Sequence, residues 1–126
     1  MRVKAIDHIV LTVASIEKAV AFYRNVLGME PVTFGPDNRC ALKFGDQKIN
    51  LHEVGNEFEP RAVRPWPGSA DVCFLVDDLT SVEAHLASCN VEIVAGPGPR
   101  TGANGEIRSY YVRDPDGNLI ELSEYA

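Results

Sequence analysis

The stretch Ile6–Val13, IDHIVLTV, decides the fold, because the chain repeats its pattern further on as Ser69–Val76, SADVCFLV. Both stretches have the length of a strand and are rich in apolar and β-branched residues, which predicts strands. A polar residue stands at the matching place in each, His8 in the first and Asp71 in the second. The matching positions indicate that the chain contains one structural unit twice.

A second pair of stretches supports the repeat. Gly45–Leu51, GDQKINL, aligns with Asp116–Leu122, DGNLIEL, and this alignment sets Asn50 against Glu121. Half of a chain of this length cannot bury both faces of its own sheet. Each unit is therefore expected to gain its core by pairing with its twin.

Each half carries the signals of a strand, a helix and three further strands. The helices are predicted at 16–27 and 79–89, the first with Ser15 as its N-cap and Gly28 just past its end. The predicted strands lie at 3–13, 30–35, 39–44, 47–53, 70–76, 92–95, 106–113 and 118–124, and the first of them is expected to be buried on both faces. Gly and Pro predict a loop at 96–105 and a linker at 55–68. The predicted fold is α+β: one domain, 1–126, in which two βαβββ modules, at about 3–54 and 69–126, pair into a cupped mixed sheet.

The composition excludes several classes of function. The net charge is −6, whereas nucleic acids and anionic membranes select a basic face. No apolar run approaches the ~20 residues of a membrane span and the N-terminus is unlike a secretion signal, so we expect a cytoplasmic protein with a small-molecule substrate. The widely spaced cysteines Cys40, Cys73 and Cys89 predict reduced and mostly buried thiols rather than disulfides.

Polar residues inside apolar strands are the candidates for chemistry. His8 and Glu121 both have apolar neighbours along the chain. Burying a carboxylate costs several kcal/mol unless it is neutralised, and a cation can neutralise several ligands at once. The residues alone leave open a hydrogen-bonded core histidine and a paired structural carboxylate, but the repeat favours one metal site that both share.

Two further residues complete a set of four candidate metal ligands. His52 lies on the same strand face as Asn50, and Asp71 aligns with His8. Histidine and carboxylate ligands suit a divalent Fe, Mn, Ni, Co or Zn ion, and the lack of thiolate ligands disfavours a structural zinc site. Two alternatives remain open: Asp71 caps a turn, and His52 only flanks the charged Glu53.

Tyr110 and Tyr111 precede the last strand, and strand alternation lets only one of their rings point towards a site. A phenol there can donate a proton or orient an oxyanion, and a ring that only fills the core is the alternative. Arginines in or beside loops are candidates for holding an anionic substrate: Arg61, Arg64, Arg100 and Arg108.

Three segments resemble the glyoxalase/bleomycin-resistance/extradiol-dioxygenase (vicinal oxygen chelate) superfamily: DHIVLTV at 7–13, AFYRNVLGM at 21–29 and RDPDGNLIE at 113–121. The likeness covers nearly the whole chain. Residues 48–53 and 67–74 look closest to the glyoxalase domain-containing protein 5 group, which includes bacterial virulence-associated lactoylglutathione lyases. The resemblance implies paired βαβββ modules and a divalent metal bound by the first and last strands of each module.

The resemblance also assigns roles to residues. His8 and Glu121 match the family's ligand positions. Asp71 stands where glyoxalase I usually has a histidine, and Asn50 stands where it has a glutamate, so simple transfer of that activity is weakened. His52 then restores a ligand next to Asn50.

The implied functions belong to different classes. The first is a glyoxalase-like lyase or isomerase of the lactoylglutathione lyase type, in which Glu121 moves a proton of a small oxygenated substrate or an adduct of glutathione or another thiol. The second is an extradiol-type dioxygenase assisted by Tyr111, which stands ten residues before Glu121. Fosfomycin-type thiol transfer and antibiotic binding without catalysis are further alternatives. A homodimer is expected because paired modules leave sheet edges to cover.

Overall fold

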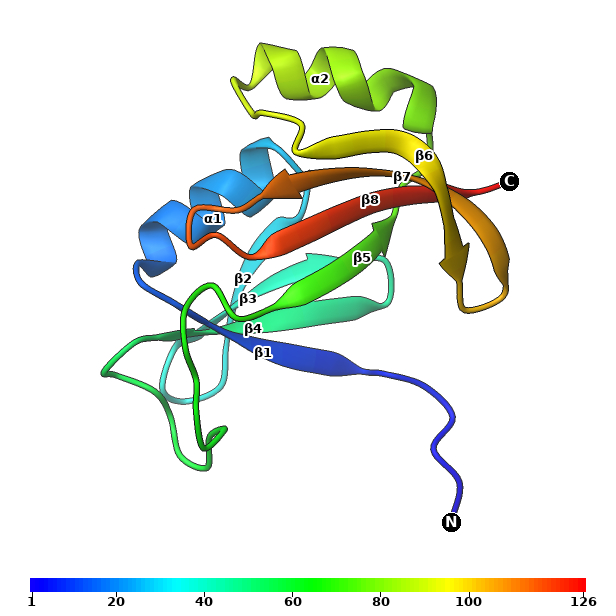
Figure 1. The fold of residues 1–126 in the computed structure, drawn as a ribbon. Coiled ribbons are helices and arrows are strands. Elements are labelled where there is room, and N and C mark those ends of the chain that lie inside the picture. Colours follow the sequence, from blue (N-terminus) through cyan, green and yellow to red (C-terminus); the bar gives the residue numbers. More distant parts are fainter. The chain divides into compact units, whose positions relative to one another are not determined.

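The computed structural model describes residues 1–126 and divides them into two compact units, module 1 (Met1–Pro67) and module 2 (Gly68–Ala126). Each module contains a four-stranded mixed sheet, and its elements follow the order β-α-β-β-β (Figure 1). The α+β class and the repeated βαβββ order are therefore confirmed. None of the helices combines the length and the apolar content that crossing a membrane requires.

Module 1 contains β1 (His8–Val13), α1 (Ile16–Asn25), β2 (Glu30–Phe34), β3 (Arg39–Phe44) and β4 (Gln47–Glu53), with the strand order β1-β4-β3-β2. β1 runs parallel to β4, and the other neighbours are antiparallel. A tight turn cannot join parallel strands, so the chain leaves the sheet through α1 before it returns.

The helix α1 begins where two side chains accept its first backbone N–H groups. Ser15 Oγ accepts from the N–H of Lys18 at 3.2 Å, as the predicted N-cap does. Glu53 Oε1 at the end of β4 accepts from the N–H of Ile16 at 3.1 Å. This second bond places the start of α1 on the sheet face of Glu53, where Ile49 and Leu51 are buried.

Module 2 contains β5 (Asp71–Leu75), the 3₁₀ turn η1 (Leu79–Ser81), α2 (Val82–Ser88), β6 (Ala95–Gly102), β7 (Gly105–Arg113) and β8 (Leu119–Tyr125), with the strand order β5-β8-β7-β6. β5 runs parallel to β8, as β1 does to β4. The phenol of Tyr110 on β7 donates to Glu83 Oε2 on α2 at 3.3 Å. α2 therefore covers the face of Tyr110, which also carries the buried Val112 and Ile120.

Two predictions for module 2 are wrong. Residues 92–94 of the predicted strand 92–95 do not form a strand, and the strand β6 begins at Ala95 and takes up most of the predicted loop 96–105. β6 is an edge strand, where a proline costs no ladder hydrogen bond if its nitrogen faces away from the neighbouring strand. The predicted helix 79–89 begins as the 3₁₀ turn and becomes α-helical only at Val82.

Two burial predictions also need correction. The first strand begins at His8 instead of residue 3, and its first half, His8–Val10, is exposed. β1 is an edge strand, and the preceding residues have no strand partner. The cysteines are free thiols as predicted, but Cys73 is exposed because it lies on the face of β5 that bears no helix.

The predicted turn at 114–117 is confirmed, and a buried carboxylate holds it. Asp114 Oδ1 accepts from the backbone N–H groups of Asp116 and Asn118, each at 2.9 Å, and its Oδ2 accepts from Asn118 Nδ2 at 2.7 Å. Asn118 Oδ1 accepts from the N–H of Ala70 at 2.8 Å. The turn thus fastens the start of β8 to the residue that precedes β5.

We predict that Asp114→Asn lowers the free energy of unfolding by about 2–3 kcal/mol. These three partners of the carboxylate are donors, so either orientation of an asparagine amide turns its NH₂ group against one of them. Urea denaturation measures the loss. Asp37→Asn in an exposed turn is the control and should stay within about 0.5 kcal/mol. Equal stability of Asp114→Asn and wild type would contradict this account of the turn.

Candidate metal and substrate site

The face of the module 2 sheet that bears no helix carries the candidate residues of the second half. Strand pairing sets Tyr111 of β7 opposite Glu121 of β8, and Cys73 of β5 lies on the other side of Glu121. Paired residues point to the same side of a sheet, so these residues share a face, which Asp71 joins two positions before Cys73. Of the two candidate tyrosines, Tyr111 shares the face of Glu121 and Tyr110 faces α2.

The carboxylate of Glu121 is half-buried and held by hydroxyl groups. Ser109 Oγ donates to Glu121 Oε2 at 2.5 Å, and Ser123 Oγ donates to the same oxygen at 3.3 Å. Both serines are buried and their hydroxyl oxygens lie 2.7 Å apart. Cys73 Sγ donates to Ser123 Oγ at 3.2 Å. Neither serine was predicted from the sequence, although Ser123 lies two positions from Glu121 and so shares its face.

Tyr111 has Glu121 and Arg100 as neighbours. Glu121 is the direct strand partner of Tyr111, and Arg100 Nε donates to the phenol oxygen at 3.1 Å. Burial raises the pKa of Tyr111; the bond from Arg100 opposes this effect, and the Glu121 carboxylate adds to it. Tyr111 therefore keeps its proton at neutral pH and is able to donate it.

Cys73 is not prepared for metal binding or nucleophilic attack. Burial raises the pKa of its thiol; the hydrogen bond with Ser123 opposes this shift, and the nearby carboxylates of Glu121 and Asp71 reinforce it. A thiolate is the form that binds metals and attacks electrophiles. The groups on this face that could bind a metal are therefore carboxylates and hydroxyl groups.

The corresponding face of module 1 is an array with Asn50 at its centre. The register of β1, β4 and β3 gives two rows, His8, Lys48 and Lys43, then Val10, Asn50 and Ala41. In the third row, Thr12 of β1 pairs with His52 of β4. The register of β3 against β4 ends at Cys40 and Leu51, and continuing it by one residue sets Arg39 beside His52. This face and the face of Glu121 are the candidate sites of the two modules.

The two modules place their candidate residues in equivalent positions. Asn50 pairs with Val10, two residues after His8, and Glu121 pairs with Cys73, two residues after Asp71. Each module thus offers a diagonal pair, with Cα atoms about 7–8 Å apart. His52 lies four residues beyond Lys48, the partner of His8, which is about 13 Å along the strand. Asn50 is therefore nearer to His8 than His52 is.

His8 and His52 lie in contrasting surroundings. His8 is exposed, and its Nδ1 lies 2.7 Å from Asp7 Oδ1, a contact that orients the ring and leaves Nε2 available to another partner. His52 is buried, and burial lowers its pKa, as does the nearby Arg39 cation, while Glu57 and Glu59 oppose the shift. His52 is thus neutral at pH 7, as a metal ligand must be.

No group of three or more His, Cys, Asp and Glu side chains gathers within either module. His8 and His52 belong to module 1, and Asp71 and Glu121 belong to module 2. The shared metal site of these four residues stays a prediction.

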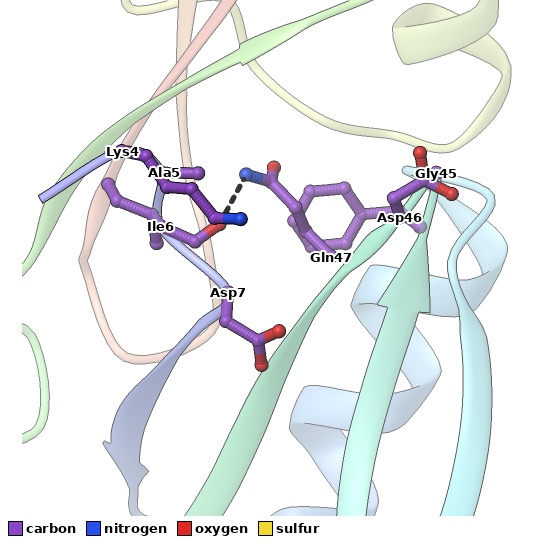
Figure 2. Close-up of a pocket in the computed structure, with 8 residues that line it drawn as sticks. Lys4, Ala5, Ile6, Asp7, Gly45, Asp46 and Gln47 are labelled. Carbon is purple, nitrogen blue, oxygen red and sulfur yellow. Dashed lines mark hydrogen bonds between the residues drawn. The ribbon is translucent and has the colours of Figure 1, made fainter.

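An open cleft of ≈ 560 Å³ lies beside the start of β1, lined by Lys4, Ala5, Ile6, Asp7, Phe44, Gly45, Asp46 and Gln47. Figure 2 shows Gln47 Nε2 donating to the backbone oxygen of Ile6 at 3.1 Å. None of the four candidate ligands lines this cleft. Its link with the site is Asp7, which borders the cleft and contacts His8.

We predict that His52 titrates below its ordinary pKa of 6.5, which an NMR pH titration of the imidazole signals measures. The unfolded chain then binds more protons than the folded one as the pH falls from about 6.5, so stability is lost in that direction. His52→Gln should lose less stability than wild type between pH 7 and 5. A His52 signal that titrates at or above 6.5 would contradict the burial argument.

A family model of the Glyoxalase/Bleomycin resistance protein/Dioxygenase superfamily matches residues 5–122. The chain is 54% identical over 126 residues to virulence protein STM3117 of Salmonella typhimurium. This alignment covers 99% of this chain and 87% of the Salmonella protein. The crystal structure of that protein matches with a TM-score of 0.97 over 100% of both chains. Glyoxalase domain-containing protein RDO1 of Mycosarcoma maydis is 51% identical, covering 99% of this chain and 70% of its own length.

Some more distant relatives are named after an enzymatic activity. A lactoylglutathione lyase from Agrobacterium tumefaciens has a solved structure that is 25% identical, with a TM-score of 0.73 over 98% of this chain and 95% of that one. Metallothiol transferase FosB of Shouchella clausii is 25% identical over 95% of this chain and 80% of its own. The similar proteins thus include a lyase and a transferase.

Proposed function

Because the chain belongs to the glyoxalase/bleomycin resistance protein/dioxygenase superfamily, we propose that it is a divalent-metal-dependent lyase or isomerase of the lactoylglutathione lyase type. One observation carries the proposal: Glu121 is half-buried, and two buried serines hold one of its oxygens. A carboxylate held in this way has a fixed direction on the face that it shares with Tyr111. The substrate in this proposal is a small oxygenated molecule or the adduct of one with a thiol.

The chemistry of the donor set fits a divalent cation. The imidazoles of His8 and His52 and the carboxylates of Asp71 and Glu121 are nitrogen and oxygen donors that suit Mn, Fe, Co, Ni or Zn. The lowered pKa of His52 supports the fit, because its ring is neutral without the help of a metal. A cation held by these residues would polarise the oxygens of the substrate.

The side chains of module 2 supply the proton chemistry. Glu121 takes a proton from a substrate carbon next to a carbonyl group and returns it to the adjacent carbon. The hydrogen bonds from Ser109 and Ser123 keep the carboxylate aimed while it does so. Tyr111 keeps its proton and offers it to the oxygen on which negative charge develops.

We predict that metal-loaded protein consumes the hemithioacetal of methylglyoxal and glutathione, and that Glu121→Gln slows this reaction by about 10²–10⁴-fold. The glutamine keeps the shape of the side chain but accepts no proton. Glu124→Gln is the matched control, because Glu124 lies on the same strand with its side chain on the opposite face. Absorbance of the hemithioacetal measures the rate. A metal-loaded wild type that leaves it unchanged, while a control lyase consumes it, would argue against this function.

The pairing of Tyr111 with Glu121 also supports an extradiol-type dioxygenase as a second candidate. In that reaction the phenol would assist a bound catechol. Protein purified without oxygen would then contain iron and convert catechol to a yellow ring-cleavage product. Iron-free protein that forms no such product after iron is added would remove this candidate.

A further inference from the structure

Among the buried side-chain nitrogen and oxygen atoms of this chain, Oδ1 of Asn50 is the one that lacks a hydrogen-bond partner. Asn50 is 8% exposed, and its Oδ1 meets no donor. Its equivalent in module 2, Glu121, is held by Ser109 and Ser123. An unpaired buried acceptor destabilises a fold by about 1–3 kcal/mol relative to an apolar side chain of the same shape. Such a group is therefore expected to have a partner that joins the protein from outside.

Positive charge surrounds Asn50 although the chain has a net charge of −6. Lys48 precedes it by two residues on the same face, and Arg39 lies diagonally across from it on β3. Each cation lies over an aromatic ring, with Lys48 Nζ 3.6 Å from the ring centre of Phe34 and the Arg39 guanidinium 4.2 Å from that of Phe58. The rings limit how far each cation can move and do not neutralise it.

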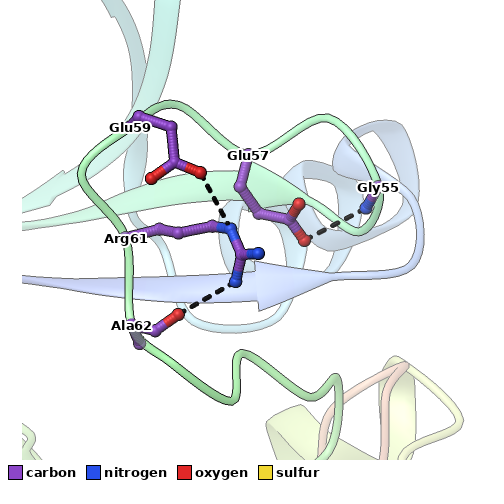
Figure 3. Close-up of polar contacts among 5 residues, drawn as sticks. All are labelled: Gly55, Glu57, Glu59, Arg61 and Ala62. Carbon is purple, nitrogen blue, oxygen red and sulfur yellow. Dashed lines mark hydrogen bonds and ion pairs between the residues drawn. The ribbon is translucent and has the colours of Figure 1, made fainter.

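The nearby carboxylates do not neutralise Arg39. Glu59 Oε1 pairs with Arg61 Nε at 3.1 Å, and Glu57 Oε2 accepts from the N–H of Gly55 at 3.0 Å (Figure 3). Lys43, the other cation of the face, has Glu30 directly opposite on β2. Arg39 thus has an aromatic partner and no acidic one, and it presents a planar set of donors that matches a carboxylate.

A short side chain lies beside Asn50 on the β3 side. Ala41, its direct partner there, is the smallest residue of the array. The Cα atoms of Asn50 and Arg39 are diagonal neighbours, about 7–8 Å apart. A two-carbon hydroxy acid is short enough to contact both side chains at once, with its carboxylate on one and its hydroxyl group on the other.

We propose that this face of module 1 binds the anionic end of a small hydroxy-carboxylate. Arg39 pairs with the carboxylate group, and Asn50 Oδ1 accepts a hydrogen bond from the hydroxyl group. Lys48 adds a second positive charge to the same face. This assignment rests on the proposed function in one respect: it names the chemical class of the substrate on which the proposed enzyme acts.

Calorimetric titration of metal-free, full-length protein with glycolate and with acetate tests the proposal. The two probes differ in one hydroxyl group, so wild type should bind glycolate about fivefold more tightly than acetate. Asn50→Leu should bind both probes with the affinity that wild type shows for acetate. Arg39→Gln should weaken both at least tenfold. Because no turnover is measured, failure here and failure of the Glu121 reaction are separate results.

Two controls keep the outcomes distinct. Lys18→Gln removes an exposed cation of α1 and should leave both affinities unchanged. Asn50→Leu should melt no lower than wild type, because it removes an unpaired acceptor, and this result shows that it folds.

Three results would overturn the proposal. If wild type binds neither probe, or binds both equally, the protein does not recognise the hydroxyl group. If Asn50→Leu still prefers glycolate, another residue recognises it. If titration with Mn²⁺ alone shows that Asn50→Leu loses the ion while its preference for glycolate persists, then Asn50 is a metal ligand instead.

Discussion

The parallel pairing of the first strand with the last strand of each module is the constraint on which the other features depend. It joins β1 to β4 and β5 to β8, and in both pairs it places one polar residue diagonally across from another. A one-residue slip of either pair would turn these side chains to the helix-covered face. In module 2, Asn118 and the buried Asp114 prevent such a slip, because they tie the start of β8 to Ala70.

The repeat has diverged into two chemically different faces. Module 2 holds a carboxylate with buried hydroxyl groups and a protonated phenol, which suits proton transfer. Module 1 carries cations over aromatic rings around an amide oxygen without a partner, which suits recognition of an anion. The same backbone position thus carries Glu121 in one copy and Asn50 in the other. Local rules of stability are broken at Asn50, and such exceptions are expected at functional sites.

Much of the fold was predictable because the repeat, the Ser15 cap and the turn at 114–117 each have a local physical cause. The strand β6 could not be predicted, because its Gly and Pro content is typical of a loop. Its position at the edge of the sheet is what allows this sequence to form a strand. In the site, alternation explains why Glu121 and Ser123 share a face. Ser109 could not be found, because the register of β7 against β8 joins residues that are distant in sequence. The unpaired state of Asn50 likewise depends on the packing around it.

Metal analysis of protein purified without chelators tests the central claim most directly, when wild type, His8→Ala and Glu121→Gln are compared. The account predicts a stoichiometric divalent ion in wild type and its loss from both variants, because His8 and Glu121 are both among the proposed ligands. Wild type that neither contains nor takes up such an ion, or variants that retain it in full, would contradict the account.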